Sequence, residues 1–118
     1  MIVARDLKVI DVEMALSLIN GYESIYQKII GTFMENQKDL VETIKKLLPH
    51  NLEEARRLVH SCKGISKNLG SLPLYEVSLK LEQAILDKDY KLIEVYFQEF
   101  EQVFRDVLRD LTKIQFIN

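Results

Sequence analysis

The sequence predicts an all-α protein, an antiparallel up-down four-helix bundle with a short extra helix at its N-terminus. Apolar residues recur at three- and four-residue steps along almost the whole chain, which is the period of a helix buried on one side. Four glycines and two prolines interrupt the 118 residues, and strand-like alternation is absent. The connections between the long amphipathic segments are short, which favours antiparallel neighbours in a bundle.

The N-terminal half is expected to hold the extra helix and the first long helix. Asp11 is a suitable N-cap for a short helix over 12–19. A long helical segment follows over 22–48, and the polar stretch 35–38 indicates a bend within it. Pro49 marks the end of this segment, because proline disfavours helix at the residue before it.

The C-terminal half is expected to hold three helices. One covers 52–69 and ends at Gly70, since glycine readily adopts the left-handed conformation after a helix. Ser71 caps the next helix, and a short turn over 87–89 leads into the last one, over 90–114. We expect seven aromatic residues to lie in the core or at its edge: Tyr22, Tyr26, Phe33, Tyr96, Phe97, Phe100 and Phe104.

Composition narrows the class of protein. The length fits a single domain over 1–118, and 47% apolar residues suffice for one core. No run of about 18 apolar residues is present, so we expect no membrane insertion. A single cysteine excludes an internal disulfide and fits a reducing, cytoplasmic location. The net charge of −2 lacks the basic excess of a nucleic-acid binder.

His60 is expected on the outer side of the helix over 52–69. At about 100° per residue, the apolar positions of this helix centre near Cys62, and His60 lies roughly 160° away. The same outer side carries one glycine and four cations: Gly64, Arg56, Arg57, Lys63 and Lys67. A neutral imidazole, with an unperturbed pKa of about 6.5, is a nucleophile at neutral pH. This surface suits a group that accepts and passes on a phosphoryl.

The residues around His60 resemble the histidine-containing phosphotransfer (HPt) domain family. Its pattern is a histidine, two residues, Lys-Gly, five residues and a glycine, with a Leu-Glu pair in the next helix. The matching positions here are His60, Lys63, Gly64, Gly70 and Leu81-Glu82. The resemblance covers nearly the whole chain. Cys62 departs from it, since the family often has leucine there, and we expect this to change packing and not chemistry.

The resemblance implies a role for each of these residues. His60 is the expected phosphorylated nucleophile. The sequence does not specify which ring nitrogen reacts, and the exposure of His60 favours Nε2, the outer one, as a hypothesis. Lys63, one turn away, is expected to stabilise the phosphoryl group, and Gly64 to leave space for the approaching partner. Glu82 is the candidate support for the other ring nitrogen, although it is equally suited to a solvent-facing position. Arg56, Arg57 and Lys67 are expected to strengthen the positive field or to bind acidic residues of a partner.

The resemblance also implies partners. Family members accept a phosphoryl group from the aspartate of a response-regulator receiver domain, or from a sensor histidine kinase, and pass it to another receiver. The receiver supplies the Mg²⁺, so we expect no cofactor of the chain's own. We expect a monomeric phosphoryl carrier without an ATP site and not a stand-alone enzyme. The chain also suits a domain of a larger hybrid sensor kinase.

Three other classes of function compete with this interpretation. One is a helical docking module that binds partners without phosphotransfer, and another is the related phosphotransfer module of chemotaxis kinases. The third is a bundle metalloprotein, which uses Glu-x-x-His pairs that project inward. Arg57 precedes His60 by three residues and Leu47 precedes His50 by three, so neither histidine has that pair and we expect no metal site.

Overall fold

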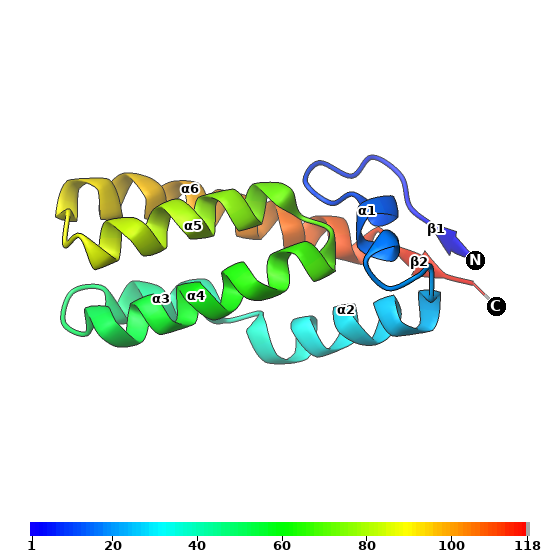
Figure 1. Cartoon of the computed structure of the whole chain (residues 1–118), viewed down its shortest axis with the longest axis horizontal. Helices are drawn as coiled ribbons and strands as arrows, with labels where there is room; N and C mark the ends of the chain where they lie inside the picture. The colour runs from blue at the N-terminus through cyan, green and yellow to red at the C-terminus, as the bar shows by residue number, and fades with distance from the viewer. Residues whose placement is uncertain (118) are drawn as a thin grey trace.

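A computed structural model describes residues 1–117 as an elongated helical bundle of 47 × 22 × 21 Å (Figure 1). The last residue of the expected domain, Asn118, lies outside the described residues. The elements, in chain order, are β1 (Ile2–Val3), α1 (Val12–Ser17), α2 (Glu23–Gln37), α3 (Leu40–Leu47), α4 (Leu52–Leu69), α5 (Leu72–Leu86), α6 (Tyr90–Thr112) and β2 (Gln115–Phe116). The predicted all-α bundle with a short N-terminal helix is confirmed.

The bundle has four sides, and the first side is made up of two consecutive helices, α2 and α3. Figure 1 shows α2 leading into α3, and α4, α5 and α6 running up and down beside them. The expected single helix over 22–48 is wrong, because α2 ends at Gln37 and α3 begins at Leu40. Asp39 lies just before α3 with ψ near 10°. Aspartate favours such helix-start positions over helix interiors, so the polar stretch becomes a break and not a bend.

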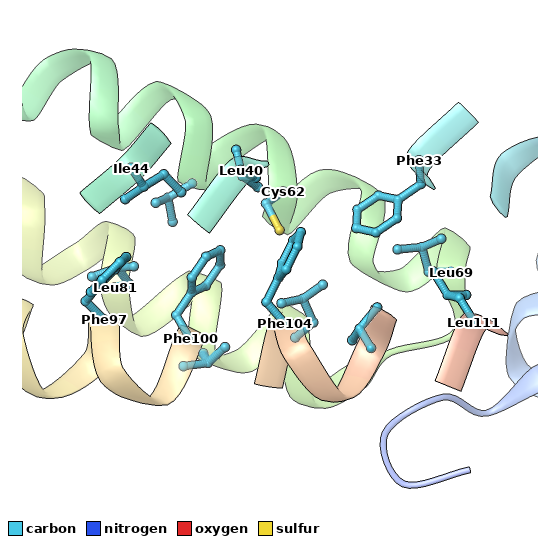
Figure 2. Close-up of a cluster of buried hydrophobic side chains, with 14 of the residues drawn as sticks. Phe33, Leu40, Ile44, Cys62, Leu69, Leu81, Phe97, Phe100, Phe104 and Leu111 are labelled. Carbon is cyan, nitrogen blue, oxygen red and sulfur yellow. The ribbon is translucent and has the colours of Figure 1, made fainter. Parts of the chain in front are cut away.

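The core runs the length of the bundle and is rich in phenylalanine (Figure 2). On α6, the rings of Phe97 and Phe100 lie 6.4 Å apart and those of Phe100 and Phe104 lie 5.8 Å apart. Phe33 of α2 packs against this row of rings, with its own ring 5.6 Å from that of Phe104. Cys62 is buried, as the sequence predicts. Tyr22 is exposed and does not join the core, because it lies outside α2 at its N-cap position.

Both chain ends lie at one end of the bundle and pair with each other. β1 and β2 form an antiparallel pair in which Ile2 faces Phe116. No strand was expected from the sequence, because elements of two residues are too short to show strand-like alternation. The segment between β1 and α1 is held by Asp110 of α6, whose buried carboxylate accepts backbone N–H bonds from Lys8, Val9 and Ile10 at 2.7–3.1 Å.

The end of α4 fixes the position of α1. Asp11 caps α1 through a bond of 3.0 Å from the Met14 N–H to its Oδ1, and its own N–H donates to the Gly70 carbonyl at 2.8 Å. Gly70 has φ +93°, and a Cβ built there would lie 2.5 Å from the Asp11 carbonyl oxygen. Glycine at this position therefore ends α4 and also lets α1 approach it closely.

Candidate functional site

Helix α4 presents His60 to solvent because its opposite side is buried. Asn51 caps the helix, accepting the Glu54 N–H at 3.1 Å. The residues that α4 buries share one side of it: Ala55, Val59, Cys62, Ser66 and Leu69. The His60 side chain, on the other side, is 59% exposed. Its position on the outside of the bundle agrees with the helical pattern of the sequence.

Glu82 of the neighbouring helix α5 binds one nitrogen of the imidazole ring. Its Oε2 lies 2.8 Å from His60 Nδ1, and its own side chain is 9% exposed. An ionised carboxylate only accepts hydrogen bonds, so Nδ1 carries the proton in this contact. In the neutral ring the lone pair then resides on Nε2. Among residues 1–117, Nδ1 to Glu82 is the one hydrogen bond that the His60 side chain makes, so Nε2 is left available.

Glu82 also binds two cations of α4. Lys63 Nζ lies 2.7 Å from Oε1, and the Arg56 guanidinium donates to Oε2 at 3.2 Å. Burial by itself raises the pKa of Glu82, but hydrogen bonds from Lys63 and His60 outweigh it, so its pKa lies below the ordinary value. The carboxylate is therefore ionised at neutral pH and serves as an acceptor for all three side chains.

Gly64 keeps the surface beside His60 open. It lies one turn after His60 on the outer side of α4, and a Cβ built there would meet nothing within 4 Å. The α-helical backbone does not demand glycine at this position, and glycine costs about 1 kcal/mol relative to alanine inside a helix. Packing within the chain therefore does not explain this residue.

The other two cations that the sequence singled out bind elsewhere. Arg57 forms an ion pair with Glu54 on its own helix. Lys67 Nζ lies 4.2 Å from the centre of the Tyr75 ring. The structure thus gathers His60, Glu82, Lys63 and Arg56 into one hydrogen-bonded group, which we call the Glu82 cluster, while Arg57 and Lys67 flank it.

Sequence reasoning missed two features of the Glu82 cluster. Lys63 was expected to contact a phosphoryl group and Arg56 to face a partner, whereas both contact Glu82. The side chain of Lys63 is 21% exposed and that of Arg56 is 24% exposed. Sequence reasoning also missed Glu53, whose carboxylate binds Arg56 at 2.9 Å. The i,i+3 spacing of Glu53 and Arg56 is a usable signal for that pair. The lysine contact needs the α4–α5 packing, which the sequence does not specify.

No three His, Cys, Asp or Glu side chains within residues 1–117 are grouped so that they could hold a metal ion. No helix in that range combines the length and apolar character needed to cross a bilayer. A hollow of about 500 Å³ lies at the end of the bundle where α4 begins, and its wall includes His50, Arg56 and Tyr90.

The fold and the Glu82 cluster define a class of protein: a helical bundle with an outward imidazole oriented by a carboxylate of the next helix. The model of the Hpt domain family matches residues 28–113, and the chain belongs to that family. Hpt domains are histidine phosphotransfer modules of phosphorelays, and they work with receiver domains and kinases. The match spans all of the Glu82 cluster but not α1. Neither the curated proteins nor the solved structures compared with the chain gave a match.

Proposed function

We propose that His60 accepts a phosphoryl group on Nε2 from the aspartyl phosphate of a receiver domain and transfers it to the aspartate of another receiver. The contact that carries this proposal is the 2.8 Å hydrogen bond between Nδ1 and Glu82, on a ring that is 59% exposed. It orients the ring and directs the nucleophilic nitrogen toward a partner. An oriented nucleophile loses less entropy on reaching the transition state.

The transfer step follows from this geometry. The Nε2 lone pair forms a bond to phosphorus while the bond between phosphorus and the aspartyl oxygen breaks, and the aspartate leaves as a carboxylate. Positive charge develops on the imidazole ring because its lone pair is shared with phosphorus. The ionised Glu82 stabilises this charge through Nδ1–H without accepting the proton.

Lys63 changes partner in this proposal. Before transfer it is bound to Glu82 at 2.7 Å. Phosphohistidine brings about two negative charges close to it, one helical turn away from the Lys63 backbone. The ammonium group then turns from Glu82 to the phosphoryl oxygens, where a charge-assisted hydrogen bond forms.

The chain acts as a carrier in this proposal. The receiver supplies the aspartate, the Mg²⁺ and the stabilisation of the transferring phosphoryl, and the open surface at Gly64 admits it. A sensor histidine kinase stands upstream, either through its receiver or by direct transfer as in chemotaxis kinases. We place the carrier in the cytoplasm, because its single cysteine fits a reducing compartment. We propose that it acts as a monomer, in which one His60 meets one receiver at a time.

Transfer of a labelled phosphoryl group tests the proposal. A receiver charged with radioactive acetyl phosphate is mixed with the chain, and the labelled chain is then treated with acid and with base. Label that is lost in acid and kept in base is the result expected for phosphohistidine. His60→Gln should abolish it while the helical circular dichroism stays unchanged. Label that persists in this variant would overturn the proposal.

A docking experiment separates phosphotransfer from simple binding. If the chain only docks partners, a complex with the receiver forms and survives His60→Gln, but neither protein passes label to the other. Transfer within seconds from at least one charged receiver is the result that supports the carrier. Transfer from none, in a panel that includes a kinase with a chemotaxis-type catalytic domain, would contradict it.

A further inference from the structure

Arg56 shares one carboxylate oxygen with the nucleophile. Its guanidinium donates to Glu82 Oε2 at 3.2 Å, and His60 Nδ1 contacts the same oxygen at 2.8 Å. The other side of the guanidinium binds Glu53 at 2.9 and 3.4 Å, which anchors it on α4. Arg56 lies one turn before His60 and Lys63 lies one turn after it. The two cations therefore bind Glu82 from opposite directions.

A carboxylate beside an imidazole has two effects that conflict in a phosphoryl acceptor. It orients the ring, and it also favours the protonated imidazolium. The imidazolium has no lone pair and does not attack phosphorus. Two cations on the same carboxylate reduce the negative field that His60 experiences, while the hydrogen bond to Nδ1 still orients the ring.

The phosphoryl group removes one of these cations from Glu82. Once Lys63 turns to the phosphoryl oxygens, a nearly buried carboxylate would lose its closest counter-ion, and an unpaired buried charge is costly. Arg56 binds Glu53 of α4 as well as Glu82, so two carboxylates hold its guanidinium. It can therefore keep its contact with Glu82 throughout the transfer.

We propose that Arg56 is a positioning residue that acts through Glu82: it offsets the negative charge that Glu82 places beside His60 Nδ1 before transfer and frees Lys63 during it. This inference rests on the proposed function of His60. The charged group that contacts the ring is Glu82 of α5, and two cations of α4, Arg56 and Lys63, bind Glu82. Arg57 and Lys67 lie on the same outer side of α4 but contact Glu54 and Tyr75. Among residues 1–117, α1, α2 and α3 contribute no hydrogen bond or ion pair to His60.

Three variants test the proposal by a pH profile. Arg56→Gln removes the cation from Glu82, and Arg56→Lys restores it. Arg57→Gln is the matched control, because Arg57 is the next residue, pairs with Glu54 at the same i,i+3 spacing and does not contact Glu82. The rate of labelling by one charged receiver is measured from pH 5.5 to 8.5. The ratio of variant to parent at each pH cancels the pH dependence of the receiver.

Loss of Arg56 should extend protonation of His60 to higher pH. We expect the acid limb of the Arg56→Gln profile to move upward by about half a pH unit, which is about a threefold lower rate at its acid end. Above pH 8 the ratio should return toward one. Arg56→Lys should follow the parent. Arg57→Gln should keep the parent's pH dependence, with a variant-to-parent ratio that stays constant across the pH range even where the loss of a partner contact lowers the overall rate. Superimposable profiles for Arg56→Gln and parent would overturn the proposal, as would an equal shift in Arg57→Gln.

A spectroscopic measurement keeps this inference separate from the proposed function. The ring nitrogens of His60, observed by NMR across the same pH range, should report an Nδ1-protonated neutral form and an upward-shifted titration midpoint in Arg56→Gln. This readout needs no receiver. Persisting label in His60→Gln refutes the proposed function, whereas an unshifted midpoint in a folded Arg56→Gln refutes the role of Arg56 alone.

Discussion

The Tyr26 hydroxyl donates a hydrogen bond of 2.8 Å to the backbone carbonyl of Leu69. Tyr26 is fully buried on α2, and Leu69 is the last residue of α4. The last carbonyls of a helix have no partner within it, so this bond from α2 provides one. Burial, with a smaller contribution from Asp11, raises the pKa of Tyr26 and keeps the hydroxyl a donor. The bond ties the end of the histidine-bearing helix to the first side of the bundle.

Tyr26→Phe should therefore lower the free energy of unfolding by about 1–3 kcal/mol, because it leaves a buried carbonyl without a donor while keeping the ring. Urea denaturation followed by circular dichroism measures the change. Tyr22→Phe is the control, since Tyr22 is exposed, and it should change the midpoint little. Equal midpoints for Tyr26→Phe and parent would show that the bond adds nothing to stability.

Glu82→Gln should change how stability depends on pH. The pKa of Glu82 is lower in the folded chain than its ordinary value of 4.5. The ionised form therefore stabilises the fold above the ordinary value, and this contribution is lost as pH falls through the folded-state pKa. The parent chain should be more stable than the Glu82→Gln variant at pH 7, because Arg56 and Lys63 lose their ionised partner in the variant.

Urea midpoints at pH 7 and pH 3 measure this gap, which should narrow in acid. Glu54→Gln, which removes the exposed pair with Arg57, should show a small gap at both pH values, because surface ion pairs contribute little. A gap for Glu82→Gln that stays constant from pH 7 to pH 3 would contradict a stabilising role for the ionised carboxylate.

The helix that bears His60 shows why much of the fold could be predicted from the sequence. The predicted range 52–69 agrees with α4, and Gly70 is the local signal that marks its C-terminal end. The helical period of the apolar residues in this helix also predicted that His60 lies on its solvent-facing side. The break between α2 and α3 was harder to predict from the sequence, since neither glycine nor proline marks it.

Contacts between distant segments were not predicted. The three N–H bonds to Asp110 join residues about one hundred positions apart, and a single aspartate on a helix gives no sign of them. The contacts of Glu82 show that side-chain pairing between helices is also beyond what periodicity predicts. Periodicity assigns Lys63 to a side of α4, but the rotamer that brings Nζ to Oε1 depends on the packing of α5 against it.

Gly70→Ala should destabilise the fold more than Gly21→Ala does. Both glycines have positive φ, +93° and +79°, so alanine is strained at either position. Only at Gly70 would the new Cβ also collide, with the Asp11 carbonyl oxygen at 2.5 Å. The difference between their free energies of unfolding, measured in urea, isolates this collision. Similar losses in the two variants would show that α1 shifts away from α4 at little cost.

Gly64→Gln should separate stability from transfer. The open space around this position admits a side chain, and replacing a helical glycine should stabilise the chain by about 0.5–1 kcal/mol. The same side chain would stand on the surface that a receiver must approach, and transfer should fall at least about tenfold, a loss of roughly 1.4 kcal/mol in transition-state stabilisation.

Gly31 provides the matched control for this variant. It is an exposed glycine within α2, and a Cβ built there also meets nothing within 4 Å. Gly31→Gln should raise the urea midpoint by a similar amount and leave the transfer rate unchanged. Normal transfer by Gly64→Gln would mean that the receiver does not pass over this part of α4.

Lys63→Met should lower the level of phosphohistidine at equilibrium with a charged receiver. Methionine keeps much of the apolar length of the side chain and removes the ammonium group. Loss of one charge-assisted hydrogen bond to the phosphoryl is worth about 1.5–3 kcal/mol, or roughly ten- to a hundredfold in the equilibrium constant. Lys67→Met is the control, because Lys67 packs over Tyr75 and lies one turn further on. Measured with the same receiver and Mg²⁺ concentration, equal losses in the two variants would show that the phosphoryl group responds to the general positive field of α4 and not to a direct contact with Lys63.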